Sequence, residues 1–529
     1  MQKRHKVNHF VVQGCYAFAM NPRLCRSAAL CALALAAAAR AELKPASLFG
    51  DHMVLQRGRP VAVWGSGPPG ETVAVSFAGR TATAKTDAGG KWSVRLKPLS
   101  TSAVPRTLTI SSGREQVAIR DVLVGEVWVC SGQSNMELTA ERGLLHPAEE
   151  IANARFPAIR LNLLGKYVSS RPLGEVESRW TETTPETMRV FSAAAYFFAR
   201  EVYGKLKAPV GLIGAYYGGS NGQSWTRREV FEADPDLKIY LDEWEANAAR
   251  GSAPPRPAPA APSAFGERPT SDRGGNSRYR PSNFYNAMIA PLLGFPIRGV
   301  LWYQGEANTA NARDAGLYAR LFPAMIRDWR AQWGEGDFPF LYVQLPTSEP
   351  PYPEPTDSAW ARVRESQEKA LALKNTAMIV TIDIGEGAVV HARNKKQVGE
   401  RLAASALNRV YGFRGIPDRY PRFRGLEIRD GKAMVRFTDA EGGLVCRNPA
   451  GLKGFAIAGA DRNFVWAEAA IRGGAVEVWS PKVAAPVAVR YGWADNPEVS
   501  LFSKAGLPAA PFRSDDWPAV KITNPRASP

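Results

Sequence analysis

The stretch Val127-Trp-Val-Cys-Ser-Gly-Gln-Ser134-Asn-Met-Glu137 joins a short apolar run to a small, polar turn. The apolar residues predict a buried strand, and the glycine among polar residues predicts a sharp turn where that strand ends. A serine at such a turn, beside a helix N-terminus, becomes a useful nucleophile when a base lies within reach. Ser134 is therefore the first candidate for a catalytic residue.

The base that usually serves such a serine is histidine, and the chain contains 5 histidines. Two of them lie near the start of the chain, and the others are His52, His146 and His391. We expect a structural role for His52, because it lies in a β-rich region. We expect His146, which opens a predicted helix, to be a cap or a surface residue. His391 lies in a loop after an apolar run.

The start of the chain has the pattern of a secretory signal. A basic segment, Met20–Arg26, precedes a small apolar segment, Ser27–Ala39, that is too short to cross a bilayer. The tripeptide Ala39-Arg-Ala41 fits a cleavage site. Residues 1–41 are thus expected to hold an upstream extension and a signal peptide, with a buried N-terminal helix as the alternative. The protein would then be secreted or periplasmic in a bacterium, and no other run is apolar enough to span a membrane.

Composition limits the class of protein further. At 529 residues the chain is too long for one ordinary core, and its 45% hydrophobic residues are typical of folded globular proteins. The net charge is +17, but the basic residues are dispersed, which argues against nucleic-acid binding and leaves a mild preference for acidic polysaccharides. After residue 41 only Cys130 and Cys446 remain, and no Cys/His cluster has metal-ligand spacing. We therefore expect no metal and no cofactor.

Three regions with different patterns follow one another along the chain. Residues 42–120 and 413–529 contain short β-type runs separated by glycine and proline, which predicts two β-sandwich-like modules. Between them, over residues 121–412, strands alternate with helices, which predicts a mainly parallel sheet covered by helices on both faces. A stretch rich in proline, alanine, glycine and arginine at about 251–282 interrupts this pattern, and we expect a mobile insertion at the rim of a site.

Four polar clusters follow predicted strands of the middle region. They are Gly132–Asn135, Gly218–Ser220, Gln304–Asn308 and the loop with His391. In parallel sheets, ligands bind beyond the C-terminal ends of the strands. Four clusters at one edge therefore predict a single site.

At these residues the chain resembles the SGNH hydrolase superfamily, specifically the carbohydrate esterases of the sialate O-acetylesterase type. The matching segments are Gly132-Gln-Ser-Asn-Met136, Gly218-Gly-Ser220 with Trp225, Trp302-Tyr-Gln-Gly-Glu-Ala-Asn308, His391 before Asn394–Gly399, Asp51–Gln56 and Tyr491–Asn496. The resemblance covers nearly all of the chain after residue 41. It implies a flavodoxin-like three-layer α/β sandwich between the two β-modules and an enzyme that removes O-acetyl groups from sugars.

The resemblance also implies a role for each matching residue. Ser134 would be the nucleophile and His391 the general base. The backbone N–H groups of Ser134 and Gly219, with the side-chain amide of Gln304, would form the oxyanion hole. A short G-x-S-x-G pattern around Ser220 offers a competing nucleophile, although the resemblance assigns that segment to the oxyanion hole.

One departure concerns the acid that orients the histidine. Relatives often carry an aspartate two or three residues before the histidine, where this chain has Val389 and Ala388. Asp383 or Glu386 could replace that aspartate, or a main-chain carbonyl could orient the ring. We favour a Ser–His dyad.

Other residues of the clusters have two alternative roles each. Glu306 could be an acid catalyst, but we favour a supporting role for Glu306 and Asn308, fixing the Gln304 loop. Trp225, Trp302 and Tyr303 could stack on sugar rings or belong to the core.

The leading hypothesis is an exported hydrolase that cleaves O-acetyl esters of an acetylated sugar or glycan through a covalent acetyl-enzyme. O-acetylated sialic acid is the substrate in the family name, and acetylated xylan, xyloglucan or pectin side chains are the alternatives. A further alternative is a non-catalytic protein whose β-modules bind glycans.

Overall fold

The computed structural model describes residues 42–250, 279–387, 389–440 and 442–518. The signal peptide expected within residues 1–41, and most of the insertion expected at about 251–282, lie outside these residues. In the part that is described, no helix combines the length and the apolar character that a membrane crossing requires.

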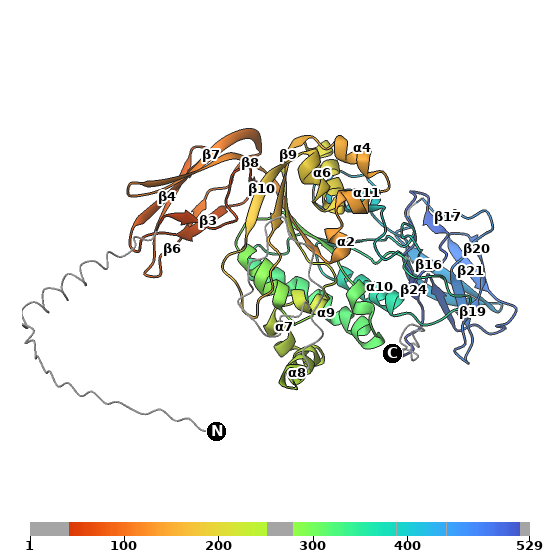
Figure 1. The fold of residues 1–529 in the computed structure, drawn as a ribbon. Helices are drawn as coiled ribbons and strands as arrows, with labels where there is room; N and C mark the ends of the chain where they lie inside the picture. Colours follow the sequence, from red (N-terminus) through yellow and green to blue (C-terminus); the bar gives the residue numbers. More distant parts are fainter. Residues whose placement is uncertain (1–41, 251–278, 388, 441, 519–529) are drawn as a thin grey trace, which may run out of the picture.

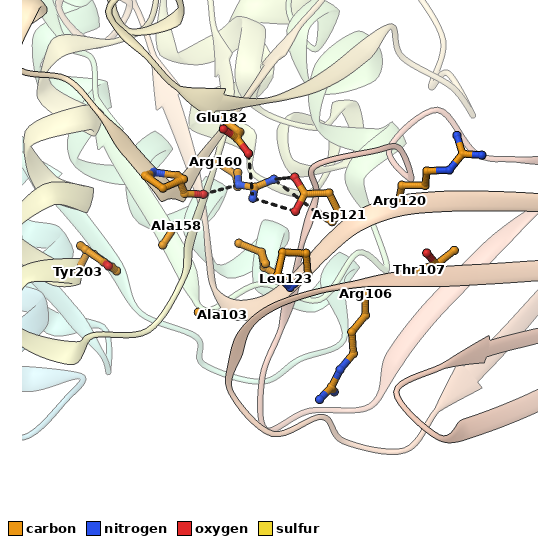
Figure 2. Close-up of a pocket in the computed structure, with 12 residues that line it drawn as sticks. Ala103, Arg106, Thr107, Arg120, Asp121, Leu123, Ala158, Arg160, Glu182 and Tyr203 are labelled. Atoms are coloured by element: carbon orange, nitrogen blue, oxygen red, sulfur yellow. Dashed lines mark hydrogen bonds and ion pairs between the residues drawn. The ribbon is translucent and has the colours of Figure 1, made fainter.

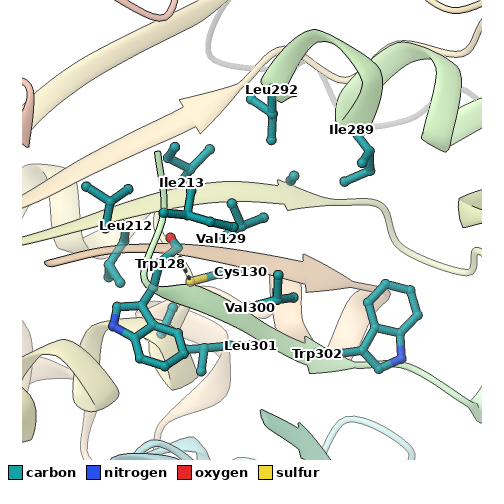
Figure 3. Packing of buried hydrophobic residues seen from close by; sticks show 14 of the residues in the cluster. Trp128, Val129, Cys130, Leu212, Ile213, Ile289, Leu292, Val300, Leu301 and Trp302 are labelled. Atoms are coloured by element: carbon teal, nitrogen blue, oxygen red, sulfur yellow. Dashed lines mark hydrogen bonds between the residues drawn. The ribbon is translucent and has the colours of Figure 1, made fainter. Parts of the chain in front are cut away.

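A large, mainly parallel sheet forms the middle of the molecule (Figure 1). Its strands, in spatial order, are β10 (Ser178–Thr183), β9 (Phe156–Leu164), β11 (Val210–Tyr216), β8 (Glu115–Gly132), β12 (Gly299–Tyr303), β13 (Phe340–Val343) and β14 (Thr376–Ile379). Only β10, at the edge, runs antiparallel to its neighbour. The apolar runs of the sequence form these strands because a sheet covered on both faces buries every residue of its central strands. Figure 3 shows side chains of β8, β11 and β12 in the resulting core.

Helices cover the two faces of this sheet, as expected (Figure 1). On one face α6 (Ala193–Leu206) packs against α11 (Lys395–Arg409), and on the other α9 (Ala312–Trp333) packs against α10 (Ala359–Lys369). α7 (Arg228–Ala233) and α8 (Pro235–Ala249) extend the second layer. The shorter helices are α2 (Ser134–Glu137), α3 (Ala140–Gly143), α4 (Pro147–Ala152) and α5 (Pro185–Arg189).

The central strands contain the flavodoxin-like order, with two strands added at one edge. In flavodoxin-like sheets the order is 2-1-3-4-5. Here β11, β8, β12, β13 and β14 lie side by side, and among these five β8 comes first in the chain and β11 second, which gives that order. β9 pairs with the outer side of β11, and β10 pairs antiparallel with β9. Hydrophobic periodicity predicts strands, but the place of β9 beyond β11 depends on long-range packing.

The N-terminal residues form two small β-arrays. One contains β1 (Lys44–Pro45), β3 (Val61–Ser66) and β6 (Lys91–Leu96), and the other contains β2 (Val54–Gln56), β4 (Thr72–Phe77), β5 (Arg80–Lys85) and β7 (Ser102–Ser112). The first half of β8 pairs with β7 and its second half with β11 and β12, so a boundary near residue 120 falls inside one strand. The apolar core of this part is continuous with the core of the large sheet.

A polar cluster fixes β8 where it passes from one part to the other (Figure 2). Asp121 has a positive φ of 54°, and its carboxylate accepts from Arg160 Nη1 at 2.6 Å and Nη2 at 3.1 Å. His52 Nδ1 lies 2.6 Å from the same carboxylate. His52 therefore has the structural place expected for it, beside an open pocket of about 830 Å³.

The C-terminal residues form a separate β-module with a core of its own. Its strands are β15 (Arg422–Arg429), β16 (Lys432–Thr438), β17 (Leu444–Cys446), β18 (Phe455–Ala458), β19 (Val465–Trp466), β20 (Glu468–Arg472), β21 (Ala475–Trp479), β22 (Ala488–Tyr491), β23 (Leu501–Ser503) and β24 (Phe512–Arg513). A fully buried arginine of α10, Arg364, docks this module on the large sheet. Its guanidinium donates to the carbonyls of Ala494 at 2.7 Å and Asp495 at 2.9 Å.

Candidate active site

The site lies at the C-terminal end of β8, where the direction of strand addition changes (Figure 1). β9 and β11 lie on one side of β8, and the later strands β12, β13 and β14 lie on the other. Ligands of open α/β sheets bind in the crevice beyond such a switch point. Ser134, the first residue of α2, follows the last residue of β8 by two positions and is half-buried.

Backbone contacts with both neighbouring strands fix the turn that carries Ser134. Gly132 has φ 134°, and a Cβ there would lie 2.1 Å from the Tyr303 carbonyl oxygen, so only glycine fits. The Gln133 N–H donates to the Tyr303 carbonyl at 3.0 Å, and the Tyr217 N–H donates to the Gly132 carbonyl at 3.0 Å. The turn is therefore held from β12 on one side and from the loop after β11 on the other.

The glycine loop after β11 touches the nucleophile candidate. A Cβ on Gly218 would lie 3.6 Å from the Ser134 Cβ, and Gly219 has φ 71°. Within the described part of the chain, the N–H groups of Ser134 and Gly219 donate to no backbone carbonyl. The oxyanion role that the resemblance implies for these two N–H groups stays a prediction.

The competing serine is fully buried and already bonded. Ser220 is 0% exposed, its Oγ donates to the Tyr217 carbonyl at 2.8 Å, and it accepts from Trp225 Nε1 at 2.8 Å. A hydroxyl in that position has no path to a substrate.

Gln304 is placed differently from the expectation of an oxyanion donor. The side chain is fully buried, and its Nε2 faces Asn308 Oδ1 at 2.8 Å, Gln133 Oε1 at 3.2 Å and the Ser220 carbonyl at 3.3 Å. An amide has two N–H donors, so three protein acceptors leave none for an oxyanion. Gln304 instead holds the residue before the nucleophile in place.

Asn308, for which we favoured a supporting role, contacts side chains and backbone of two loops. Its Oδ1 accepts from the Gly222 N–H at 2.9 Å, and its Nδ2 donates to Gln223 Oε1 at 2.9 Å. It therefore joins the loop after β12 to the loop after β11.

Glu306 also lies behind the nucleophile. Its side chain is 8% exposed, and its Oε1 accepts from the side-chain amide of Asn135. Burial raises the pKa of Glu306, against the lowering effect of the Asn135 hydrogen bond. The second oxygen, Oε2, has no hydrogen-bond partner among the described residues.

His391 lies in the loop between β14 and α11 and is half-buried. The carbonyl before it, of Val390, accepts from Asn135 Nδ2 at 2.9 Å, and the carbonyl after it, of Ala392, accepts from Lys395 Nζ at 2.6 Å. Burial lowers the pKa of His391, and the charges of Lys395 and Arg142 lower it further. A lowered pKa favours the neutral imidazole that a general base requires.

The two candidate acids are bound to arginines rather than to His391. Asp383 forms a bidentate pair with Arg401, at 2.7 Å for both oxygens. Glu386 accepts from Arg393 Nε at 3.0 Å and from the Arg393 backbone N–H at 2.6 Å.

A different carboxylate faces the site. Glu137, three residues after Ser134, pairs with Lys166 through Oε1, while its buried Oε2 has no hydrogen-bond partner in the described residues. A Cβ on Gly218 would lie 3.2 Å from that Oε2. The charge of Glu137 opposes the lowering of the His391 pKa.

The three candidate aromatic residues belong to the core, the second of the two roles considered for them. Trp225 and Trp302 are 0% exposed and Tyr303 is 1% exposed. Their rings are therefore not available to stack on a sugar.

Sequence reasoning gave no role to two residues of the site, Asn135 and Lys395. They stand 260 positions apart and meet at 2.8 Å. A lysine at the start of a helix is usually exposed, so the sequence gives little reason to expect a buried one. Its position shortly after His391 is the one feature that could have indicated a role.

Comparisons with known proteins relate this chain to carbohydrate esterases. Residues 272–408 match the family described as "Carbohydrate esterase, sialic acid-specific acetylesterase". The sialate O-acetylesterase of Mus musculus is 28% identical over 88% of this chain and 93% of its own length, and that of Homo sapiens is 28% identical over 74% and 76%. The crystal structure of a carbohydrate acetylesterase from Xanthomonas citri is 36% identical, covers 90% of this chain and 100% of that one, and has a TM-score of 0.77. The chain therefore belongs to the carbohydrate esterases of the sialate O-acetylesterase type and is a serine carboxylic-ester hydrolase of that kind.

Proposed function

We propose that this protein hydrolyses O-acetyl esters of sugars through an acetyl-enzyme on Ser134, with His391 as the general base. The observation that carries the proposal is the joining of the two loops. Asn135, next to Ser134, binds the carbonyl before His391 and accepts from Lys395, which binds the carbonyl after His391.

In the first half of the reaction, His391 takes the proton of the Ser134 hydroxyl while Oγ attacks the acetyl carbonyl. The N–H groups of Ser134 and Gly219 donate to the oxyanion that forms. The tetrahedral intermediate collapses, the sugar oxygen leaves with the proton from His391, and the acetyl group stays on Oγ. In the second half, His391 takes a proton from a water molecule as the water oxygen attacks the acetyl carbonyl. The second tetrahedral intermediate collapses, Ser134 Oγ leaves with the proton from His391, and the acetic acid is released and ionises to acetate in solvent.

We further propose that the base works as a Ser–His dyad. Asp383 and Glu386 are each neutralised by an arginine, which supports this reading. The backbone bonds on both sides of His391 take over the orienting role that an aspartate has in a triad.

For the substrate, we propose an O-acetylated sialic acid. The family match and the mammalian relatives support it by their names. Acetylated xylan, xyloglucan and pectin are the alternative, because the Xanthomonas citri protein is described only as a carbohydrate acetylesterase.

Acetate release from a panel of these glycans tests the substrate proposal. We expect the highest kcat/KM on O-acetylated sialic acid, with no release by Ser134→Ala. Preference for acetylated xylan, xyloglucan or pectin would replace the substrate and keep the mechanism.

We propose that the protein is exported, on the basis of the pattern within residues 1–41. Expression of the full chain in a bacterial host should yield a periplasmic protein whose N-terminus lies near Glu42. An uncleaved protein in the cytoplasm would contradict export.

A further inference from the structure

A buried lysine lies next to the proposed catalytic base. Lys395, the first residue of α11, is 1% exposed. Its Nζ donates to Asn135 Oδ1 at 2.8 Å and to the Ala392 carbonyl at 2.6 Å. An ammonium is expensive to bury without partners, so a lysine that is kept there has a specific environment built around it.

Asn135 connects Lys395 and the His391 loop to the turn that carries Ser134. It directly follows Ser134, is 0% exposed, and accepts from Lys395 while its Nδ2 donates to the Val390 carbonyl at 2.9 Å and to Glu306. Its amide is thereby held at both ends.

The two side chains together fix the loop of the base on the turn of the nucleophile. Val390 and Ala392 flank His391, and both of their carbonyls are bonded within this network. The backbone on each side of the imidazole is therefore tied to the residue that follows Ser134. A misplacement of about 1 Å between reacting groups can reduce a rate on the order of 10²-fold.

We propose that Asn135 and Lys395 are positioning residues that hold His391 against Ser134, and that the charge of Lys395 keeps the imidazole neutral and ready to accept a proton. This inference rests on the proposed roles of Ser134 and His391.

The charges around His391 and Lys395 support the inference that Lys395 keeps the imidazole neutral. Lys395 from α11, Arg142 from α3 and Glu137 from α2 act on His391, the two cations disfavouring the imidazolium and the carboxylate favouring it. Glu306 and Glu386 act on Lys395.

Lys395 also carries its charge in the mildly acidic pH range in which the base is tested. Burial lowers the pKa of Lys395 to about 7, against the attraction of its two carboxylate neighbours. The pKa of His391 is lowered from 6.5. Below about pH 7 Lys395 is therefore mostly protonated, and its charge acts on the acid limb of the rate profile.

Replacing the lysine tests this inference. Lys395→Met keeps the length of the side chain and removes its charge, so the acid limb of kcat/KM should move to higher pH and kcat should fall with little change in KM. A purely structural role would reduce the amount of active enzyme, which a fluorophosphonate titration of Ser134 measures, and would leave the midpoint of the acid limb unmoved.

Three further variants sharpen the test. Asn135→Ala changes no charge and should lower kcat on the order of 10²-fold without moving the acid limb. Glu137→Gln should move the acid limb the opposite way, to lower pH. Lys396→Met is the matched control, since this neighbouring lysine is 47% exposed and pairs with Glu150, and it should behave as wild type.

The inference is overturned if Lys395→Met retains the wild-type acid limb, or if Asn135→Ala retains the wild-type kcat. Should Lys395→Met fail to fold, as judged by circular dichroism, the Asn135→Ala result decides alone. Absence of fluorophosphonate label on Ser134 in the wild type would instead refute the proposed function, so the two failures are distinct.

Discussion

At the scale of single residues, the surroundings of a serine decide whether it can react. Ser220 sits in a glycine-rich turn that fits a nucleophile pattern, yet its hydroxyl is buried and bonded to Tyr217 and Trp225. Ser134 is half-buried just past the end of the central strand, and among the described residues its backbone N–H donates to no backbone carbonyl. A short motif cannot separate these two cases, because burial and hydrogen bonding arise only in the fold.

The lowered pKa of His391 predicts a pH profile. Burial and the charges of Lys395 and Arg142 disfavour the imidazolium, so the base stays neutral to a lower pH than an ordinary histidine. The midpoint of the acid limb of kcat/KM should therefore lie below about 6.5. Rates measured between pH 4 and pH 8 check this, and a midpoint above 6.5 would contradict the environment described for His391.

Gln304 offers a second test at this scale. If it holds the Gln133 turn, Gln304→Ala removes the donor of buried acceptors such as the Ser220 carbonyl. The free energy of unfolding should then fall by about 1–3 kcal/mol for each acceptor left without a donor, along with kcat. An oxyanion donor would behave differently. Its removal should lower kcat by roughly 10²–10³ and leave stability unchanged. Chemical denaturation together with steady-state kinetics separates the two outcomes.

At the scale of elements, the turn between β8 and α2 depends on one glycine. Gly132 has a positive φ, and a Cβ there would collide with the Tyr303 carbonyl. Gly132→Ala should therefore destabilise the protein by about 1–3 kcal/mol from backbone strain alone, and abolish activity. Gly316→Ala is the control: this exposed glycine of α9 has no atom near a new Cβ, and alanine there should stabilise by about 1 kcal/mol. Equal effects in both variants, measured by thermal unfolding, would argue against the close approach.

The elements themselves could be predicted from the sequence, but their arrangement could only be predicted in part. Apolar runs such as Val210–Tyr216 form strands because burial on both faces demands apolar residues at every position. No local feature of the sequence indicates that β11 lies between β9 and β8. No local feature indicates that β8 continues through residue 120 either, because a strand stays extended when its pairing partners change.

At the scale of the whole molecule, one buried guanidinium joins the C-terminal module to the sheet. Arg364 donates to the carbonyls of Leu345, Pro346, Ala494 and Asp495, which belong to both parts. An arginine inside an amphipathic helix has the sequence pattern of a surface residue, so this contact was not predictable.

Removing this guanidinium should loosen the docking of the module. Arg364→Met removes the donor of the Leu345 and Ala494 carbonyls, each at a cost of about 1–3 kcal/mol. We expect a lower Tm or a separate transition of the module in calorimetry. Lys369→Met, an exposed change on the same helix, should leave the transition unchanged.

Trapping the acetyl-enzyme tests the central claim most directly. The protein is mixed with O-acetylated sialic acid that carries an isotopically labelled acetyl group, quenched with acid during turnover, and digested for mass spectrometry. We predict labelled acetyl on Ser134 in the wild type, and neither label nor acetate release in Ser134→Ala. Continued release of acetate by Ser134→Ala, or label on another residue such as Ser220, would contradict the proposed mechanism.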